Sequence, residues 1–277
     1  MTSKTIVFIH GNFVNYQCWD KWVARYEARG YKCIAPPYPR RDKSVSELRK
    51  AHPDPKTAEV TTEQVINLYV STINSLDEKP IIIGHSFGGM LTQLMINRGL
   101  GAVGVAIDSV PPQGLLSFKL SFLRSTFPLL NPLTPASKPW LMPFKHYQYA
   151  FNNTSPVADQ RRNYDATMVP ESIPLARGGL GPKAHVDFKK AHVPLLFIGG
   201  EKDHIMPASL NRANVQKYKN GSTSITDYKE FAGRDHLTVI AGPGWEEVAD
   251  YALDWVEKQQ PATENGRREA AQAVPVR

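Results

Sequence analysis

Short apolar runs, rich in β-branched and aromatic residues, alternate along this chain with stretches whose apolar residues recur at helical spacing. The runs lie at residues 5–10, 31–35, 80–84, 103–107, 193–199 and 224–231. Runs of this kind form the strands of parallel sheets, because helices on both faces of the sheet bury them completely. We therefore predict an α/β fold, a mostly parallel sheet with helices on both faces. A chain of 277 residues can bury a large core around such a sheet.

The alternation is interrupted between the fourth and fifth runs. Residues 111–187 are rich in proline and aromatic residues. We predict that this segment, inserted between two core strands, is a cap over the carboxyl edge of the sheet; a second packing layer without a ligand role is the alternative. Residues 1–110 and 188–260 would form the core, with a polar loop up to about Pro55. The tail, residues 261–277, is polar and charged, and we expect it to be disordered.

The formal net charge is +7 at pH 7, but the basic residues are dispersed over several short clusters. No basic stripe alternates with aromatic residues on one element, which argues against nucleic-acid binding. A further hypothesis is that an anionic substrate is attracted to the mouth of a pocket by Arg40, Arg41 and His52. The chain shows no apolar run long enough to span a membrane and no signal peptide, so we expect a cytoplasmic location. The sequence leaves the oligomeric state open.

The pentapeptide Gly84-His85-Ser86-Phe87-Gly88 lies between a predicted strand and a helical pattern. G-x-S-x-G in this context is typical of a nucleophile elbow, a turn so sharp that its serine adopts a strained backbone conformation. Small residues must flank the serine, because larger side chains would collide with the strand or the helix. The hydroxyl then lies at a helix N-terminus, where the dipole favours developing negative charge. We predict that Ser86 is a catalytic nucleophile.

A serine nucleophile needs a base to accept its proton, and the base needs a carboxylate to orient it. Asp203 follows the run at 193–199, and His236 lies in the loop after the last run. Both therefore fall at the carboxyl ends of strands, where chemistry gathers in such sheets. We predict Asp203 as the acid and His236 as the base, with Asp108 and Glu201 as competing acids. In the alternative interpretation, Asp203 only caps the following helix.

Two backbone amides are predicted to hold the oxyanion of the substrate. One belongs to Phe87, directly after the nucleophile. The other belongs to Asn12 or Phe13 in the loop after the first run, with Phe13 favoured narrowly. His85 is expected to pack beneath the elbow, and His10 to brace the oxyanion loop.

Four residues are candidates for the substrate pocket: Trp140, His146, Tyr147 and Leu237. The first three belong to the predicted cap, and Leu237 follows the predicted base. An apolar pocket under the cap would bury the acyl or alcohol part of a substrate and exclude bulk water. Two cysteines are too few for a structural zinc site, and the predicted chemistry needs no metal ion and no cofactor.

The chain resembles the α/β-hydrolase superfamily, and within it serine esterases and lipases. The motifs that carry the resemblance are His10-Gly11 after the first run, the elbow around Ser86, Asp203 and His236. The resemblance covers residues 1–110 and 190–258, and it implies a Ser-His-Asp triad, an acyl-enzyme intermediate and hydrolysis by water. Hydroxynitrile lyases of this fold characteristically carry lysine directly after the histidine, where this chain has Leu237.

We therefore predict a serine hydrolase that cleaves small-molecule carboxylic esters with an apolar portion. Two alternatives belong to other classes. One is cofactor-free haloperoxidase or dioxygenase chemistry on the same fold, and the other is a hydrolase-fold receptor that binds a small apolar ligand with little turnover. The sequence leaves open the preferred chain length of the ester and any amide or lactone activity.

Overall fold

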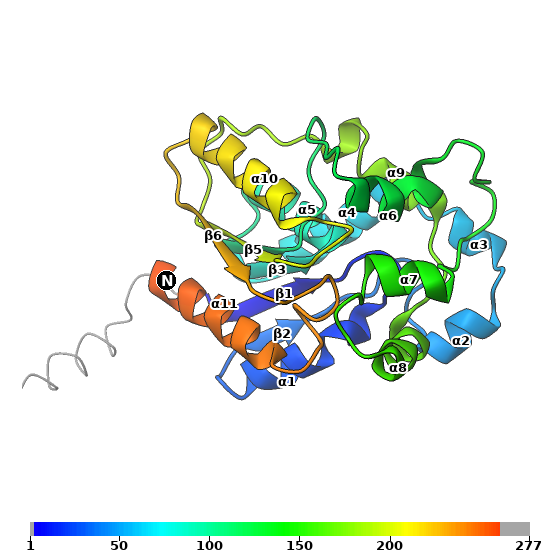
Figure 1. The fold of residues 1–277 in the computed structure, drawn as a ribbon. Helices are drawn as coiled ribbons and strands as arrows, with labels where there is room; N and C mark the ends of the chain where they lie inside the picture. The colour runs from blue at the N-terminus through cyan, green and yellow to red at the C-terminus, as the bar shows by residue number, and fades with distance from the viewer. Residues whose placement is uncertain (1–2, 261–277) are drawn as a thin grey trace, which may run out of the picture.

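One six-stranded sheet forms the centre of the computed structural model, which describes residues 3–260 (Figure 1). The strands are β1 (Thr5–Ile9), β2 (Lys32–Ile34), β3 (Ile81–His85), β4 (Val103–Ile107), β5 (Leu195–Gly200) and β6 (Thr226–Phe231). Their order is β2-β1-β3-β4-β5-β6, and every neighbouring pair is parallel. Each strand overlaps a predicted run, and the predicted fold class is confirmed. The tail predicted to be disordered, residues 261–277, lies outside the described residues.

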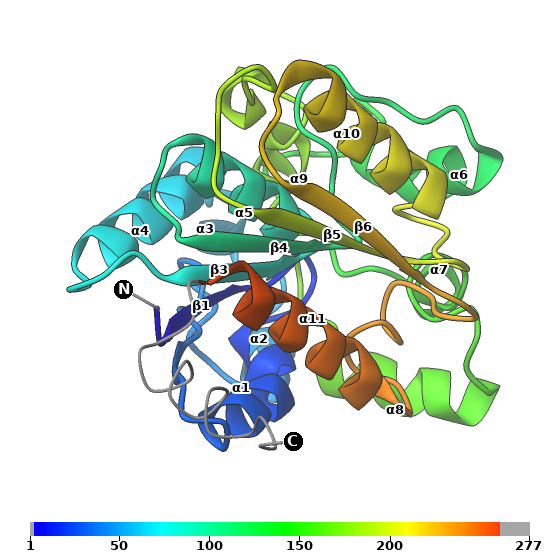
Figure 2. The ribbon, with the colours of Figure 1, turned by 90° about the vertical axis from the view of Figure 1, so that its left-hand side faces the viewer.

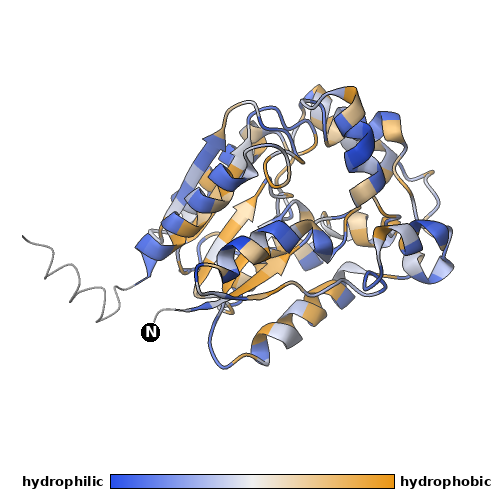
Figure 3. Ribbon diagram, turned by 90° about the horizontal axis from the view of Figure 1, so that it is seen from below, coloured by the Kyte–Doolittle hydropathy of each residue, from blue (hydrophilic) through white to orange (hydrophobic). Residues whose placement is uncertain are grey.

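Helices cover both faces of the sheet (Figures 1 and 2). The 3₁₀ helix η1 (Tyr16–Trp19), α1 (Asp20–Glu27) and α11 (Trp245–Gln259) lie on one face, and α4 (Thr62–Asn74), α5 (Phe87–Asn97) and α10 (Ala208–Gly221) lie on the other. Successive strand residues point to opposite faces, so Ile6 and Phe8 pack in one core, and Val7 and Ile9 in the second. Figure 3 accordingly shows the central strands as hydrophobic and the helices as striped.

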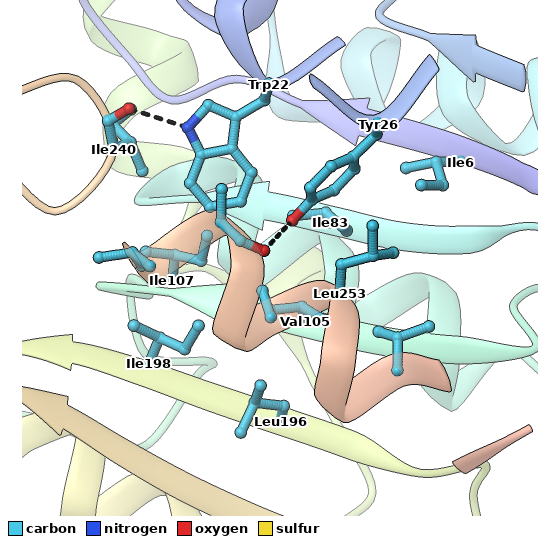
Figure 4. Close-up of a cluster of buried hydrophobic side chains, with 14 of the residues drawn as sticks. Ile6, Trp22, Tyr26, Ile83, Val105, Ile107, Leu196, Ile198, Ile240 and Leu253 are labelled. Atoms are coloured by element: carbon cyan, nitrogen blue, oxygen red, sulfur yellow. Dashed lines mark hydrogen bonds between the residues drawn. The ribbon is translucent and has the colours of Figure 1, made fainter. Parts of the chain in front are cut away.

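The core beneath α1 and α11 contains large side chains whose polar atoms have partners (Figure 4). Trp22 Nε1 donates a hydrogen bond to the carbonyl of Ile240 at 2.8 Å, and the Tyr26 hydroxyl donates to the carbonyl of Ala249 at 2.6 Å. Pairing the polar tip of a buried aromatic residue avoids the desolvation penalty. Leu253 of α11 packs in the same cluster and is fully buried.

We expect Leu253→Ala to lower the free energy of unfolding by about 2–5 kcal/mol, because it leaves a cavity in this core. Urea denaturation followed by circular dichroism measures the change. Leu133→Ala is the matched control, since Leu133 is 85 % exposed and its truncation should change stability by only about 0.5 kcal/mol. Equal effects of the two substitutions would contradict the assignment of Leu253 to the core.

Two short helices, α2 (Val45–Lys50) and α3 (Pro55–Ala58), lie in and just after the stretch predicted to be a loop. That prediction was wrong for α2, because α2 has no buried residue and hence no apolar periodicity to mark it. Its start is instead fixed by a capping box: the Ser44 hydroxyl accepts the amide of Glu47, and the Glu47 carboxylate accepts the amide of Ser44.

The inserted segment, residues 111–187, adds a group of helices between β4 and β5. They are α6 (Leu120–Leu130), α7 (Phe144–Ala150), α8 (Val157–Thr167), α9 (Ile173–Gly178) and the 3₁₀ helix η2 (Pro182–Ala184). An apolar cluster joins this segment to Phe13, Ile205 and Leu237, which follow β1, β5 and β6. Side chains of the segment thus pack against loops at the carboxyl ends of the strands. Within residues 3–260, no helix combines the length and the hydrophobicity that crossing a membrane requires.

Candidate active site

The turn between β3 and α5 has the geometry of a nucleophile elbow. Ser86 has φ 59° and ψ −118°, a strained conformation for a residue with a side chain, and α5 begins at the next residue. A Cβ atom added at Gly88 would lie 2.0 Å from the carbonyl oxygen of Ile9, and one added at Gly84 would lie 2.1 Å from the carbonyl oxygen of Gly88. Only glycine fits at these two positions, so β1 and α5 can approach closely around the serine.

His236 and Asp203, from the loops after β6 and β5, form a buried hydrogen-bonded pair. His236 Nδ1 donates to Asp203 Oδ2 at 2.6 Å, since a carboxylate oxygen only accepts, and both side chains are inaccessible to solvent. The other oxygen of Asp203 accepts the amides of Ile205 and Met206, each at 2.8 Å. These contacts fix the carboxylate, and they hold the imidazole in the tautomer that leaves Nε2 ready to accept a proton.

His236 Nε2 has no hydrogen-bond partner among the described residues, so Ser86 makes no hydrogen bond to this pair. The ring of His85, which precedes Ser86, lies 4.5 Å from the ring of His236, and His85 Nε2 donates to the carbonyl of His236 at 2.9 Å. Burial, and then the neighbouring His236, hold the pKa of His85 well below its usual value. Catalytic hydrogen bonds are often long in free enzymes and tighten when substrate binds.

The loop after β1 lies directly against the elbow. A Cβ atom added at Gly11 would lie 2.9 Å from Cβ and 3.4 Å from Oγ of Ser86. His10 Nδ1 donates to the carbonyl of Gly11 at 2.9 Å, and its Nε2 accepts the amide of Tyr38 at 3.3 Å. Burial, and then the charge of Arg41, lower the pKa of His10 to about 3, so the ring is neutral and can make both contacts. His10 therefore holds the first residue of the oxyanion loop.

The inserted segment holds the next part of this loop. Phe13 has φ 67°, in the left-handed region that disfavours bulky residues. Its amide donates to Glu171 Oε2 at 2.9 Å, and its carbonyl accepts the amide of Val169 at 2.8 Å. The Phe13 amide is thus already occupied, whereas the Asn12 amide has no hydrogen-bond partner in the described part of the chain. This contact favours Asn12 over Phe13 as the oxyanion donor, and the assignment of either amide stays a prediction.

A buried ion pair, which the sequence analysis missed, supports the same loop. Glu171 Oε1 accepts from Arg41 Nη2 at 2.5 Å, and Arg41 Nη1 donates to the carbonyl of Val14 at 2.8 Å. The two side chains are 0 % and 3 % exposed. The guanidinium of Arg41 therefore binds groups of the protein itself rather than an anionic substrate. Arg40 likewise forms an ion pair with Asp54 at 3.0 Å. No sequence motif surrounds Glu171, so only this long-range contact reveals it.

We expect Glu171→Gln to lower kcat for an ester about 10- to 100-fold with little change in KM. The substitution keeps the shape of the side chain but leaves Arg41 without its counter-charge, so Phe13 and the adjacent Asn12 amide lose their fixed position. Complete loss of an oxyanion donor costs about 10²–10³ in kcat, and a displaced donor should cost less. Initial rates over a range of ester concentrations give the two constants.

The exposed Glu201→Gln is the matched control and should leave kcat unchanged. Urea denaturation of both variants is needed as well, because breaking a buried pair lowers the free energy of unfolding by about 3–5 kcal/mol. A folded Glu171→Gln protein with wild-type kcat would show that the ion pair supports the fold alone.

Asp108, the competing acid, follows β4 and lies close to His85 and His236. Its Oδ1 accepts the amide of Gly200 at 2.7 Å, while its Oδ2 has no partner within residues 3–260. Burial, and then the negative charge of Asp203, raise the pKa of Asp108 well above its usual value. Asp203, and not Asp108, makes the hydrogen bond to His236 Nδ1, so the geometry favours Asp203 as the acid.

The side chains of His85, Asp108 and His236 form the only candidate metal cluster in the described part of the chain. Donor atoms of His85, Asp108 and His236 lie within 4.8 Å of one another. Metal ligands must be deprotonated, and burial raises the pKa of Asp108, which disfavours its charged form. His236 Nδ1 is moreover bonded to Asp203. The donor set therefore fits a cation poorly.

A cavity of about 60 Å³ is lined by the Ser86 elbow and the oxyanion loop. Asn12 and Phe87 contribute to its polar end. The rest of its wall is apolar and includes Phe122, Leu129, Phe151, Ile205 and Met206. A small apolar group can thus be buried beside the Ser86 hydroxyl.

The structure describes all four residues that were predicted to form the substrate pocket. None of them lines this cavity. Trp140 packs edge-on against Phe13, and His146 donates to a backbone carbonyl at 2.8 Å. Tyr147 and Leu237 belong to the apolar cluster beneath the inserted segment. These side chains pack against one another and against the core, and their role in a substrate pocket stays a prediction. The true lining residues had no signal in the sequence that separates them from core residues.

Known proteins are similar to this chain over most of its length. The chain matches the model of the Alpha/beta hydrolase family over residues 6–251. It is 27 % identical to Methylesterase 8 of Arabidopsis thaliana over 265 residues, covering 93 % of this chain and 91 % of the relative.

Solved structures show the same fold. An extracellular alpha/beta-hydrolase from a Paenibacillus species has a TM-score of 0.66 at 21 % identity, covering 90 % of this chain and 98 % of the other. Polyneuridine aldehyde esterase has a TM-score of 0.61 at 18 % identity, covering 91 % of this chain and 99 % of the other. The family match extends over most of the sequence, and this chain therefore belongs to the alpha/beta hydrolase family.

Proposed function

We propose that this chain is a serine hydrolase that cleaves carboxylic esters with an apolar portion through an acyl-enzyme intermediate. The observation that carries the proposal is the buried Asp203–His236 pair, in which the His236 ring lies 4.5 Å from the ring of His85, the residue before Ser86 in the strained elbow. The similarity to proteins named methylesterase and polyneuridine aldehyde esterase supports ester hydrolysis.

In the first half of the reaction, the Ser86 hydroxyl attacks the ester carbonyl while His236 Nε2 takes its proton. Asp203 stabilises the imidazolium that forms. The amides of Asn12 and Phe87 donate to the oxyanion of the tetrahedral intermediate; the Phe87 amide is the first of α5, where backbone N–H groups lack an intrahelical acceptor. His236 then gives the proton to the departing alcohol oxygen, which leaves an acyl group on Ser86.

In the second half, water attacks the acyl-enzyme while His236 takes its proton, and His236 returns this proton to Ser86 Oγ as the carboxylic acid leaves. The apolar wall of the cavity would hold the acyl or the alcohol part of the ester. Residues 111–187 would act as the cap that excludes bulk water. The catalytic groups in these steps all belong to this chain.

The cytoplasmic location and the absence of nucleic-acid binding stay predictions.

Rates with p-nitrophenyl acetate, butyrate and octanoate test the proposal. We expect many turnovers per chain, a preference for the shorter esters because the cavity is small, and stoichiometric labelling of Ser86 by a fluorophosphonate. His204→Ala is a matched control for His236→Ala: His204 follows the acid but donates to the Tyr149 carbonyl at 2.8 Å, outside the proposed proton path.

Two results would overturn the proposal in favour of the alternatives. Oxygen uptake with a heteroaromatic substrate and no ester turnover would indicate cofactor-free oxygen chemistry. Stoichiometric labelling of Ser86 without turnover of any ester would indicate a ligand-binding protein.

A further inference from the structure

The exposed large apolar side chains of the described chain are concentrated in one stretch of the inserted segment. They are Leu116, Phe118, Leu120, Leu123, Phe127, Leu130 and Leu133, which we call the apolar surface. Phe118 and Leu133 are 85 % exposed, and Leu120 is 82 % exposed. Within residues 3–260, Val157 and Ile225 are the only others in this class. Such a concentration marks an interaction site, because monomers rarely expose contiguous apolar patches of this kind.

Helix α6 carries part of the apolar surface and part of the cavity wall, and Leu130 at its end belongs to both. Leu120, Leu123 and Phe127 are spaced three and four residues apart, so they share one face of the helix. Phe122 and Leu129 are buried and line the candidate active-site cavity. Figure 2 shows α6 at the outer edge of the molecule, away from the sheet. A partner that meets the exposed face therefore lies one helix away from the cavity.

The charges in this part of the chain have one sign. Residues 109–158 contain no aspartate and no glutamate. Lys119, Arg124, Lys138 and Lys145 are all exposed in the same stretch, and Lys119 lies between two residues of the apolar surface. The apolar surface is therefore accompanied by positive charge only.

We propose that the apolar surface docks on an anionic lipid layer. Its leucine and phenylalanine side chains would enter the boundary between headgroups and acyl chains, while the lysine and arginine side chains contact lipid phosphates. The charge pattern argues against a second copy of this chain as the partner, because a two-fold pairing would place Lys119 and Arg124 near their own copies with no acidic residue of this stretch between them. Docking without spanning agrees with the absence of a membrane-crossing helix among the described residues.

Co-sedimentation with vesicles tests this proposal independently of the proposed hydrolysis, because all proteins carry Ser86→Ala. We compare vesicles of phosphatidylcholine alone with vesicles that also contain phosphatidylglycerol. We expect binding to the mixed vesicles, and at least a 10-fold weaker partition for Phe118→Ser/Leu120→Ser/Phe127→Ser, none of which lines the cavity. Lys119→Glu/Arg124→Glu should lose the preference for anionic vesicles, since each cation near the surface contributes about fivefold.

Val157→Ser/Ile225→Ser is the matched control, since it removes the exposed apolar side chains outside the apolar surface, and it should bind as the parent does. Circular dichroism confirms folding, and with Ser86 restored the triple serine variant should hydrolyse p-nitrophenyl acetate at the rate of the wild type. Failure of the parent to bind mixed vesicles, or equal binding by parent and triple variant, would overturn the proposal. So would a parent dimer that the triple variant converts to a monomer, because a second copy would then cover the apolar surface.

Discussion

Ser86→Ala is expected to lower kcat for p-nitrophenyl butyrate by about 10⁴–10⁶ while the protein keeps its fold. Alanine removes the atom that forms the acyl-enzyme, and nothing else in the proposed mechanism can replace it. The oxyanion amides of Asn12 and Phe87 would still be in place, so a small residual rate above that of water is expected. Initial rates with active-site titration measure the loss, and thermal unfolding confirms that the variant is folded.

The controls for this prediction come from the same chain. Ser125→Ala removes a buried hydroxyl that has no hydrogen-bond partner in the described structure, and it should leave kcat unchanged. The double variant Ser86→Ala/His236→Ala should be no slower than Ser86→Ala, because residues that act as one unit lose their effect together. If Ser86→Ala retains more than a tenth of the activity, the nucleophile has been assigned wrongly.

The residues that could be predicted from the sequence are those whose signals are local. The strands appear as apolar runs because both faces of the sheet are covered. Ser86 is marked by glycines that the contact between β1 and α5 requires. Asp203 and His236 were predicted because each follows a strand, and the parallel sheet brings their loops to one edge. The structure adds the hydrogen bond between these two residues.

The rest of the site depends on contacts between distant segments. Glu171 and Arg41 are 130 positions apart, and neither lies in a recognisable motif. The cavity wall comes partly from α6, whose buried face has the same periodicity as any core helix. The aromatic residues Trp140 and Tyr147 were predicted to line the pocket. In the structure, Tyr147 belongs to the apolar cluster of the inserted segment, and Trp140 packs against that cluster. Choosing Asn12 over Phe13 also required knowing that Glu171 occupies the Phe13 amide.

Asp203→Asn is expected to lower kcat about 10⁴-fold, whereas Asp108→Asn should leave it within about threefold of the wild-type value. The asparagine at 203 removes the negative charge that stabilises the His236 imidazolium and can hold the ring in the wrong tautomer. The asparagine at 108 leaves the Asp203–His236 hydrogen bond in place, and its oxygen can still accept the amide of Gly200. Initial rates with p-nitrophenyl butyrate at pH 7 compare the two variants. A larger loss in Asp108→Asn than in Asp203→Asn would place the acid at Asp108 instead.

The pH dependence of stability gives a second test of Asp108. Because its pKa is raised in the folded protein, the folded state binds more protons than the unfolded chain between the unfolded pKa, about 3.9, and the higher folded value. The contribution of Asp108 to the free energy of unfolding is therefore fully present below about pH 3.9 and is lost as the pH rises through that window. Asp108→Asn cannot ionise, so its stability relative to the wild type should increase from pH 4 to pH 7 in urea denaturation. A constant difference between the two proteins would show that Asp108 is ionised in the folded state, and the pair of carboxylates would then have to share the charge of His236.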